Sequence, residues 1–339
     1  MKLTIISSIT ENERDTNSFL KDLTEQDTQD FEVILCLNKS SSSKKIFSLI
    51  SEYGKFFGSR LKVVWNYKNQ SVNYNIASAF RIAKGNYVTI INSDTSLRKY
   101  YLLKMIEQAT KYDVDVLEFK PRLIGSTRWK PKARIITQEP VKIANRPDVF
   151  AYTFPFILNK IFKRTVVQKY EKNWPKQSAD DKLAVSLNYQ LMLLSKTYMY
   201  VDSRIKRDYF DLETWINPKT YINNFKDIEK MFMNYESKIM HEYEYAKNYF
   251  FKVFLPGLIT DVSFISVRNL IHYKELNEKR SKKFVDELKV YIDKLQKSPE
   301  FKMFMDTNNY MLLKNTETDL IKNNIPISKW RNILNELEE

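Results

Sequence analysis

The chain has 339 residues, of which 43% are hydrophobic and 14% aromatic, and its formal net charge is +14. This length and composition exclude a disordered chain and allow about two domains with substantial hydrophobic cores. The single cysteine, Cys36, excludes a disulfide within one chain. The two histidines, His241 and His272, are too few and too far apart for a zinc site.

The N-terminal residues and the apolar segments indicate where in the cell the protein is located. Met1–Ile6 enters a predicted strand directly, without the long apolar core of a signal peptide. No stretch of about twenty uninterrupted apolar residues is present. We therefore expect a cytoplasmic protein that is either soluble or peripheral at the inner face of the cell membrane.

The positive charge suggests anionic partners without naming one of them. Anionic lipid surfaces, anionic polymers and nucleic acid all attract a basic protein through the same screened field. The sequence shows no zinc-finger, helix-turn-helix or aromatic RNA-binding signature, so we do not expect a nucleic-acid partner.

The first ninety residues predict strands that alternate with helices. The predicted strands are Leu3–Ser8, Phe31–Leu37, Leu61–Trp65 and Tyr87–Ile91, and the predicted helices are Asn12–Leu23, Lys44–Phe57 and Tyr74–Ala83. Such alternation implies a parallel sheet with right-handed crossovers. The predicted fold class of this part is therefore α/β.

A short acidic turn, Asn92-Ser93-Asp94, follows the fourth predicted strand. The carboxyl ends of strands in open α/β sheets are where ligands bind. Asn92 and Asp94 are spaced so that both can face one hard cation, Mg²⁺ or Mn²⁺, which would bridge to phosphate oxygens. An ordinary polar turn is the alternative for so short a motif. Five glycines provide neither a dinucleotide fingerprint nor a P-loop.

With these elements the chain resembles the inverting family 2 glycosyltransferases, whose nucleotide-sugar-binding domain has the GT-A fold. Leu3–Ser8, the turn at Leu37–Ser40 and Asn92-Ser93-Asp94 stand where that family has its first strand, its uracil-contacting turn and its Asp-x-Asp metal motif. Ala83–Tyr87 is similar to the family's Ala-Lys-Gly-Glu-Tyr. The resemblance covers roughly residues 1–210.

Two later segments extend the resemblance. Pro155–Arg164 is similar to the family's Asn-Lys-Leu-Phe-Lys-Arg segment, and Ser178–Leu183 is similar to its Glu-Asp turn. The resemblance implies that Asp181 opens a helix and serves as catalytic base, with Asp180 in place of Glu. The alternative is a helix N-cap followed by core positions. Those core positions would be Leu183, Leu187, Leu191 and Leu194.

The resemblance also implies ligands and their residues. It implies a UDP-sugar donor and a Mg²⁺ or Mn²⁺ cofactor held by Asn92 and Asp94. The implied nucleotide-sugar-binding residues are Ser8, Asn38, Asn92, Ser93, Asp94 and Asp180.

Three departures from the family pattern weaken these implications. Asn38 and Asn92 replace aspartates, and the family's Ala-Arg-Asn segment falls at Asn75-Ile76-Ala77, so its arginine is missing. Fewer carboxylates mean weaker binding of divalent metal. Either a lysine or arginine elsewhere supplies the charge, or the enzyme is slow, or the chain is a non-catalytic relative.

Beyond about Asp211 the pattern becomes helical, with predicted helices at Tyr221–Tyr249, Lys274–Leu295 and Ile327–Leu337. We expect residues 1–210 to form the GT-A-like domain and residues 211–339 a helical region for acceptor, membrane or oligomer contacts. Tyr249–Ile271 is rich in aromatic residues. It is either a core helix or a surface that contacts lipid or another protomer.

The predicted function is inverting transfer of a hexose from a UDP-sugar to an acceptor hydroxyl on a membrane glycolipid or cell-envelope polymer. Within the family, the plan of the chain resembles bacterial enzymes that decorate teichoic acid or capsule, and mycoplasmal glycolipid synthases. Expected partners are the donor, a lipid or anionic polymer acceptor, an anionic membrane surface and a second copy of the chain. The alternative is a catalytically silent relative that binds carbohydrate or membrane beside an active enzyme.

Overall fold

The computed structural model describes residues 1–9, 12–39, 43–68, 70–125, 128–170, 183–210, 216–235, 239–259 and 272–339. The chain divides into two compact units. Unit 1 consists of Met1–Pro121, Ile135–Asn145 and Phe156–Tyr209, and unit 2 of Arg122–Arg134, Arg146–Pro155 and Phe210–Glu339. Each unit is therefore built from three separate segments of the sequence, and the chain passes from one unit to the other several times.

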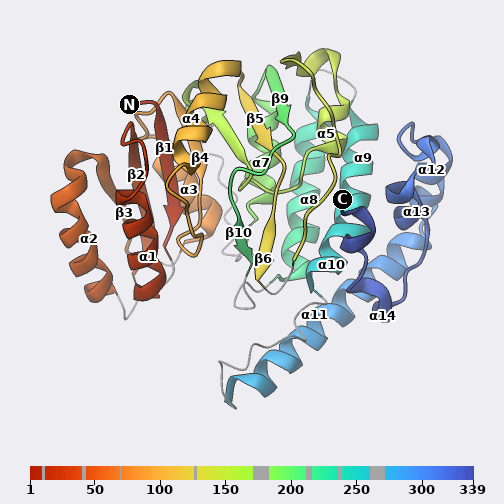
Figure 1. The fold of residues 1–339 in the computed structure, drawn as a ribbon. Helices are drawn as coiled ribbons and strands as arrows, with labels where there is room; N and C mark the ends of the chain where they lie inside the picture. Colours follow the sequence, from red (N-terminus) through yellow and green to blue (C-terminus); the bar gives the residue numbers. More distant parts are fainter. Residues whose placement is uncertain are drawn as a thin grey trace. The chain divides into compact units, whose positions relative to one another are not determined.

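Unit 1 contains an eight-stranded sheet in the order β3-β2-β1-β4-β8-β5-β9-β7 (Figure 1). The strands are β1 (Leu3–Ser8), β2 (Phe31–Asn38), β3 (Leu61–Asn66), β4 (Tyr87–Ile90), β5 (Val116–Phe119), β7 (Val141–Lys142), β8 (Lys160–Lys163) and β9 (Thr197–Val201). Strands β1 to β4 are parallel, and so are β5 and β9. Because β8 pairs antiparallel with both β4 and β5, those two strands point the same way. The carboxyl ends of β1, β2, β4, β5 and β9 therefore share one edge of the sheet.

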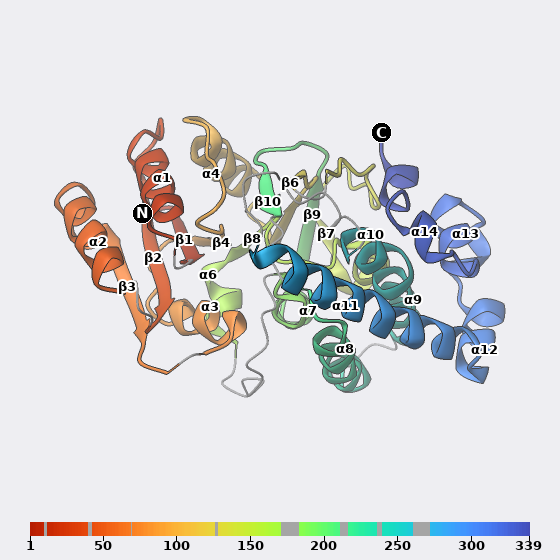
Figure 2. The ribbon, with the colours of Figure 1, turned by 90° about the horizontal axis from the view of Figure 1, so that it is seen from below.

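Helices cover both faces of this sheet. They are α1 (Glu13–Thr24), α2 (Ser43–Phe57), α3 (Val72–Phe80), α4 (Tyr101–Tyr112), α6 (Arg164–Gln168) and α7 (Val185–Leu193). Helices α1, α2 and α4 contribute Leu20, Ile50 and Met105 to one core with β1 and β2. Figure 2 shows α3 on the opposite side of the strands from α1 and α4. The α/β fold class is confirmed, and α3 ends three residues before its predicted end at Ala83.

A buried carboxylate, Glu32, fastens the amino edge of the sheet. Its oxygens accept hydrogen bonds from Thr4 Oγ1 at 2.7 Å, from Lys62 Nζ at 2.5 Å and from the backbone N–H of Lys84. Burial by itself would raise the pKa of Glu32, but the bonds from Lys62, Lys84 and Thr4 outweigh it and lower the pKa. A Cβ on Gly85 would lie 2.6 Å from the backbone of Leu3 and Thr4, so this close approach requires glycine. The start of β4 is thereby tied to β1.

A second buried network holds antiparallel β8 between β4 and β5. Lys160 and Glu118 are both fully buried, with Nζ 3.3 Å from Oε1. Glu118 also accepts hydrogen bonds from Tyr198 Oη at 2.9 Å and Asn159 Nδ2 at 3.2 Å, while Lys160 Nζ donates to the carbonyl of Phe156 at 2.8 Å. Since every partner lies inside unit 1, the Asn159-Lys160 pair of the family-like segment stabilises the sheet.

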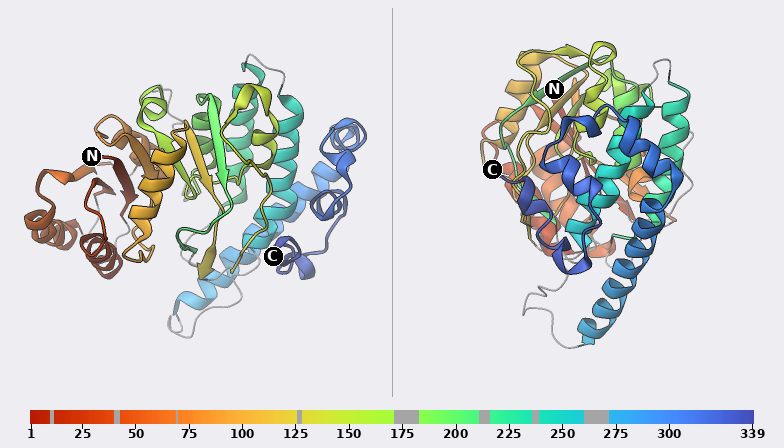
Figure 3. Two further views of the ribbon diagram at one scale, coloured as in Figure 1. Left: turned by 45° about the horizontal axis from the view of Figure 1, so that its top comes forward. Right: turned by 90° about the vertical axis from the view of Figure 1, so that its right-hand side faces the viewer.

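Unit 2 is mostly helical. Its helices are α5 (Asp148–Tyr152), α8 (Pro218–Met233), α9 (Met240–Tyr249), α10 (Leu255–Ile259), α11 (His272–Gln296), α12 (Pro299–Thr307), α13 (Thr316–Lys322) and α14 (Ile327–Trp330). The short strand β6 (Leu123–Gly125) also belongs to unit 2, whereas the short strand β10 (Asp208–Phe210) crosses the boundary between the units along the chain. Figure 3 shows α11 as one long helix, against which α8, α10 and α12 pack. Within the described part of the chain, no helix has the length and apolarity needed to cross a membrane.

Two helix predictions in this region are wrong. The predicted helix Tyr221–Tyr249 is two helices, because α8 ends at Met233 with Asn234 as its C-cap and α9 begins at Met240. The predicted helix Ile327–Leu337 is the short α14 followed by a 3-10 turn at Leu334–Leu337. Apolar spacing continued across both breaks, so the periodicity alone did not reveal them.

The aromatic segment predicted at Tyr249–Ile271 is a core element as far as it is described. Phe250, Phe251 and Phe254 are fully buried, and Phe250 packs against the rings of Tyr221 and Phe225. The alternative of a lipid-contacting or protomer-contacting surface is therefore wrong for residues 249–259. Residues 260–271 lie outside the described part.

A buried ion pair links the segments of unit 2. The Arg134 guanidinium makes two hydrogen bonds of 2.8 Å to the Glu317 carboxylate, which also accepts one from Tyr245 Oη at 2.7 Å. Arg134 also lies 3.5 Å from the centre of the Tyr249 ring. A bidentate, aromatic-flanked pair of this kind fixes the position of residues 122–134 within the helical unit.

Candidate functional site

The structure brings several predicted site residues to the carboxyl edge of β2, β1 and β4. Ser8 ends β1, Asn38 ends β2, and Asn92-Ser93-Asp94 follows β4. Ser93 Oγ donates a hydrogen bond to the carbonyl of Ser8 at 3.4 Å. The turn after β4 is thus attached to the end of β1. Both lie at the edge where open α/β sheets bind their ligands.

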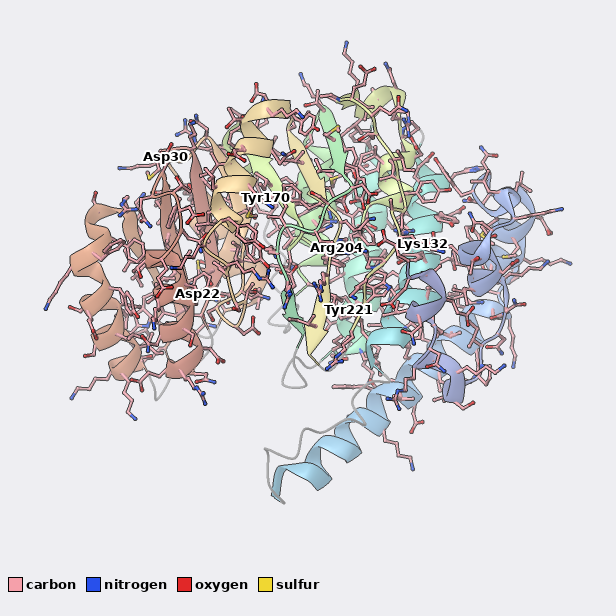
Figure 4. All side chains as sticks on the ribbon, viewed as in Figure 1. Asp22, Asp30, Lys132, Tyr170, Arg204 and Tyr221 are labelled. Carbon is pink, nitrogen blue, oxygen red and sulfur yellow. The ribbon has the colours of Figure 1, made fainter. Side chains whose placement is uncertain are left out.

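The turn after β4 is rigidly held. The Thr95 N–H donates to the Asn92 carbonyl at 3.0 Å, which closes a β-turn. Asn92 is 8% exposed and Ser93 1%, whereas Asp94 is half-buried. Asp22 on α1, labelled in Figure 4, accepts a 2.7 Å hydrogen bond from the N–H of Leu97. The polar atoms of the turn are therefore presented on a supported backbone.

Asn38 belongs to a network of amides. Its Oδ1 accepts hydrogen bonds from the N–H of Gln70 at 3.3 Å and from Asn75 Nδ2 at 3.2 Å, and its Nδ2 donates to the Gln70 carbonyl at 3.0 Å. Asn66 in turn donates to Asn75 Oδ1.

This network fixes the orientation of the Asn38 amide. The backbone N–H of Gln70 can only donate and its carbonyl can only accept, so the oxygen and nitrogen of Asn38 cannot be exchanged. The Asn38 oxygen already accepts two hydrogen bonds. It could accept the ring N–H of uracil only if one of them broke.

The donor set for a divalent cation is small. Among the described residues no group of three or more His, Cys, Asp or Glu side chains could hold a metal ion. Asp94 offers one carboxylate and Asn92 one neutral amide oxygen. Such a set fits a hard cation that is bound jointly by the protein and a diphosphate, because Mg²⁺ typically keeps one or two carboxylates together with phosphate and water oxygens.

The segment before α7 was predicted to carry the catalytic turn. Asp180 and Asp181 lie outside the described residues. The helix expected to open at Asp181 begins at Val185 instead, after Ala184 in a left-handed conformation with φ of 48°. Of the core positions given by the alternative interpretation, Leu183, Leu187 and Leu191 are buried and Leu194 is half-buried.

Charged residues that belong to none of the sequence motifs follow β5 and β9 at the same edge. Lys120, only 5% exposed, pairs with Asp202, and Lys206 pairs with the buried Asp208. Burial raises the pKa of Asp208, and Lys206 only partly opposes that effect. Arg204, labelled in Figure 4, lies in the same stretch. The sequence does contain a signal for Lys120 and Asp202, because each directly follows an apolar strand, β5 or β9.

Comparisons with known proteins agree with this geometry. The model of "Glycosyl transferase family 2" matches residues 4–171. A comparison with curated protein sequences finds no significant match.

Solved structures share the fold at low sequence identity. S. aureus TarS 1–349 in complex with UDP has a TM-score of 0.61 at 15% identity, covering 99% of this chain and 90% of that one. Its complex with UDP-GlcNAc gives 0.59 at 15% identity, covering 99% and 91%. Mannosyltransferase PcManGT from Pyrobaculum calidifontis, in complex with GDP-Man and Mn²⁺, gives 0.50 at 11% identity, covering 99% and 84%. With its mostly parallel sheet and the matched residues 4–171, this chain contains a family 2 glycosyltransferase domain of the GT-A fold.

Proposed function

We propose that the protein transfers a hexose, with inversion, from a UDP-sugar to a hydroxyl of a cell-envelope polymer or membrane glycolipid. The observation that carries the proposal is the gathering of Ser8, Asn38 and Asn92-Ser93-Asp94 at one sheet edge, within the segment matched by the family model. The UDP and UDP-GlcNAc complexes of TarS support a uridine nucleotide as the donor.

In this proposal, different residues at the carboxyl edge contact different parts of the donor. Asp94 and Asn92 would face the diphosphate, and a bound Mg²⁺ or Mn²⁺ would stabilise its negative charge. Ser8, Ser93 and Asp180 would contact the nucleotide-sugar, and Asn38 would lie on the base side. Arg204 would supply the positive charge of the family arginine that is missing at Ile76.

The catalytic base in this proposal is Asp181. A carboxylate close to the acceptor hydroxyl would take its proton as the oxygen attacks the anomeric carbon, while the diphosphate departs from the opposite face. A single direct displacement of this kind inverts the configuration at that carbon.

The net charge of the protein is the basis for the proposed acceptor. The net charge of +14 favours an anionic polymer or an anionic lipid surface, and would hold a peripheral protein at the inner face of the membrane. Binding to vesicles should be stronger with anionic lipid than with neutral lipid and should weaken as salt rises. Equal flotation with both kinds of vesicle would remove the membrane part of the proposal.

The deciding experiment is a thermal-shift series with UDP, GDP, CDP and dTDP, each with and without Mn²⁺. A nucleotide that binds the native state raises its apparent stability by mass action. We expect a shift with UDP that grows with Mn²⁺. No shift with any nucleotide would instead favour a silent relative, for which the two hydrogen bonds already accepted by the Asn38 oxygen are the supporting observation.

A further inference from the structure

A basic pocket lies within unit 2 where the end of α11, the start of α12 and the end of α13 meet. Its volume is about 610 Å³, and its lining includes Lys297, Lys302, Lys322, Asp306, Gln296 and Phe301. The three lysines are exposed. With Asp306 as the only acidic side chain in the lining, the pocket has an excess of positive charge.

A buried lysine stands behind the wall of this pocket. Lys252 is 4% exposed and lies in the π-helical turn Phe250–Phe254, whose other four residues are fully buried and apolar. Its Nζ donates a 2.7 Å hydrogen bond to Gln296 Oε1 and lies 4.6 Å from the centre of the Phe301 ring. Gln296 and Phe301 both line the pocket, so the ammonium group of Lys252 is separated from it by a single layer of side chains.

The orientation of Gln296 is determined by its partners. Its Nε2 donates to the carbonyl of Lys322 at 3.1 Å, which leaves Oε1 to accept from Lys252. A neutral amide therefore satisfies one proton of the ammonium group without neutralising its charge.

None of the four lysines forms an ion pair with a described carboxylate, and Lys297 interacts with Asp293 only from a longer distance. In the part of the chain that the structure describes, no carboxylate oxygen lies within 4.0 Å of the Nζ of Lys252, Lys297, Lys302 or Lys322. Burial lowers the pKa of Lys252 to about 8. An uncompensated ammonium group in the interior is costly, and an anion in the adjoining pocket would offset that cost.

The start of α12 also contributes positive electrostatic potential to the pocket. Ser298 caps this nine-residue helix by accepting a hydrogen bond from the N–H of Phe301 at 3.1 Å, and both residues line the pocket. The N-terminus of a helix carries partial positive charge and favours anions. A phosphate is the anion that best matches several ammonium donors around one site.

We propose that this pocket is a phosphate-binding site for a phosphorylated ligand, distinct from the nucleotide-sugar site of unit 1. Its volume exceeds that of a single phosphate ion, so the ligand is a sugar or polyol phosphate or one unit of a phosphodiester polymer. The proposal rests on residues of unit 2 alone and stands whether or not the UDP-sugar proposal is correct.

The test measures binding of glycerol 3-phosphate and of long-chain inorganic polyphosphate to the full chain, by calorimetry at constant ionic strength. We expect Lys302→Glu to weaken binding about tenfold, because it reverses a charge in the pocket. Lys226→Glu is the matched control, since it makes the same change in net charge at an exposed site on α8. Its affinity should stay within about twofold of the unmodified protein.

Lys252→Met tests the buried charge separately. Methionine fills similar volume without a charge, so the variant should fold and should bind glycerol 3-phosphate more weakly than the unmodified protein. If that variant does not fold, Lys322→Glu replaces it as the second test.

Two results would overturn the proposal: unchanged affinity in Lys302→Glu and in the second variant, or equal losses in Lys302→Glu and Lys226→Glu. Two others support it and identify the source of the phosphate. Much tighter binding of polyphosphate per phosphate group indicates a polymer. Equal affinity per phosphate group indicates a small phosphorylated molecule.

Discussion

The two edges of the unit 1 sheet use polar side chains in different ways. At the amino edge, the Glu32 carboxylate is bonded to Lys62, Thr4 and Lys84, and Asp113 accepts a 2.7 Å hydrogen bond from Tyr87 Oη and pairs with Lys163. At the carboxyl edge, neutral amides at Asn38 and Asn92 accompany the single turn carboxylate, Asp94. The amino edge is built to hold strands together, and the carboxyl edge presents atoms of the kind that ligands bind.

This contrast implies that similar substitutions should have opposite consequences. Removing a carboxylate at the amino edge should reduce stability and leave the activity of each folded molecule unchanged. Removing one at the carboxyl edge should do the reverse. Single substitutions at each edge test this difference.

The largest effect is expected for the proposed base. Asp181→Asn keeps shape and hydrogen bonding but removes proton acceptance, so turnover should fall by about 10²-fold or more with little change in UDP affinity. Asp180→Asn should cost less. Steady-state rates with a competent acceptor measure both. Equal losses would indicate a structural role for the pair, and a normal rate in Asp181→Asn would remove it from the mechanism.

The next effect concerns metal-dependent nucleotide binding at the carboxyl edge. Asp94→Ala should abolish the enhancement of UDP binding by Mn²⁺, because the turn has no second carboxylate. Asn92→Asp should strengthen it, because an added carboxylate raises the charge of the ligand set. Calorimetry with and without metal provides the measurement, and the melting temperature of each variant serves as the control. An unchanged metal response in Asp94→Ala would show that the cation is held elsewhere.

At the amino edge, Glu32→Gln should reduce the free energy of unfolding at pH 7 by about 3 kcal/mol, since it leaves buried donors and Lys62 without their anion. The pKa of Glu32 is lowered on folding, so its contribution is present above the unfolded value near 4.5 and is lost as pH falls through the folded value. Urea unfolding should therefore show the difference between the two proteins shrinking from pH 7 to pH 3. Asp113→Asn is the control, because its carboxylate is 66% exposed and should contribute less.

The remaining effect is a pH response in unit 2. The pKa of Lys252 is about 8 in the folded protein against 10.5 as its ordinary value. Between these values the unfolded chain binds more protons, so stability should rise with pH in that window. The stability of Lys252→Met relative to the unmodified protein should accordingly fall between pH 8 and pH 10.5. A constant difference across that range would mean that Lys252 titrates normally.

Local patterns were enough to predict much of unit 1. The predicted bounds of β1 are confirmed, and α1 and α2 begin within one residue of their predicted starts. Apolar spacing and capping residues act over a few neighbours, and Asn12 and Ser71 do cap α1 and α3. The turn Asn92-Ser93-Asp94 was found because an apolar strand stops there abruptly.

The pairing of distant segments and the covering of apolar faces depend on long-range contacts that the sequence does not reveal. The insertion of β8 between β4 and β5, with Lys160 paired to Glu118, depends on residues that are far apart in the sequence. Burial of Phe250 depends on the rings of Tyr221 and Phe225, and the orientation of Asn38 depends on Gln70 and Asn75. Sequence periodicity reports which side of an element is apolar, whereas the partner that covers that side is set by long-range packing.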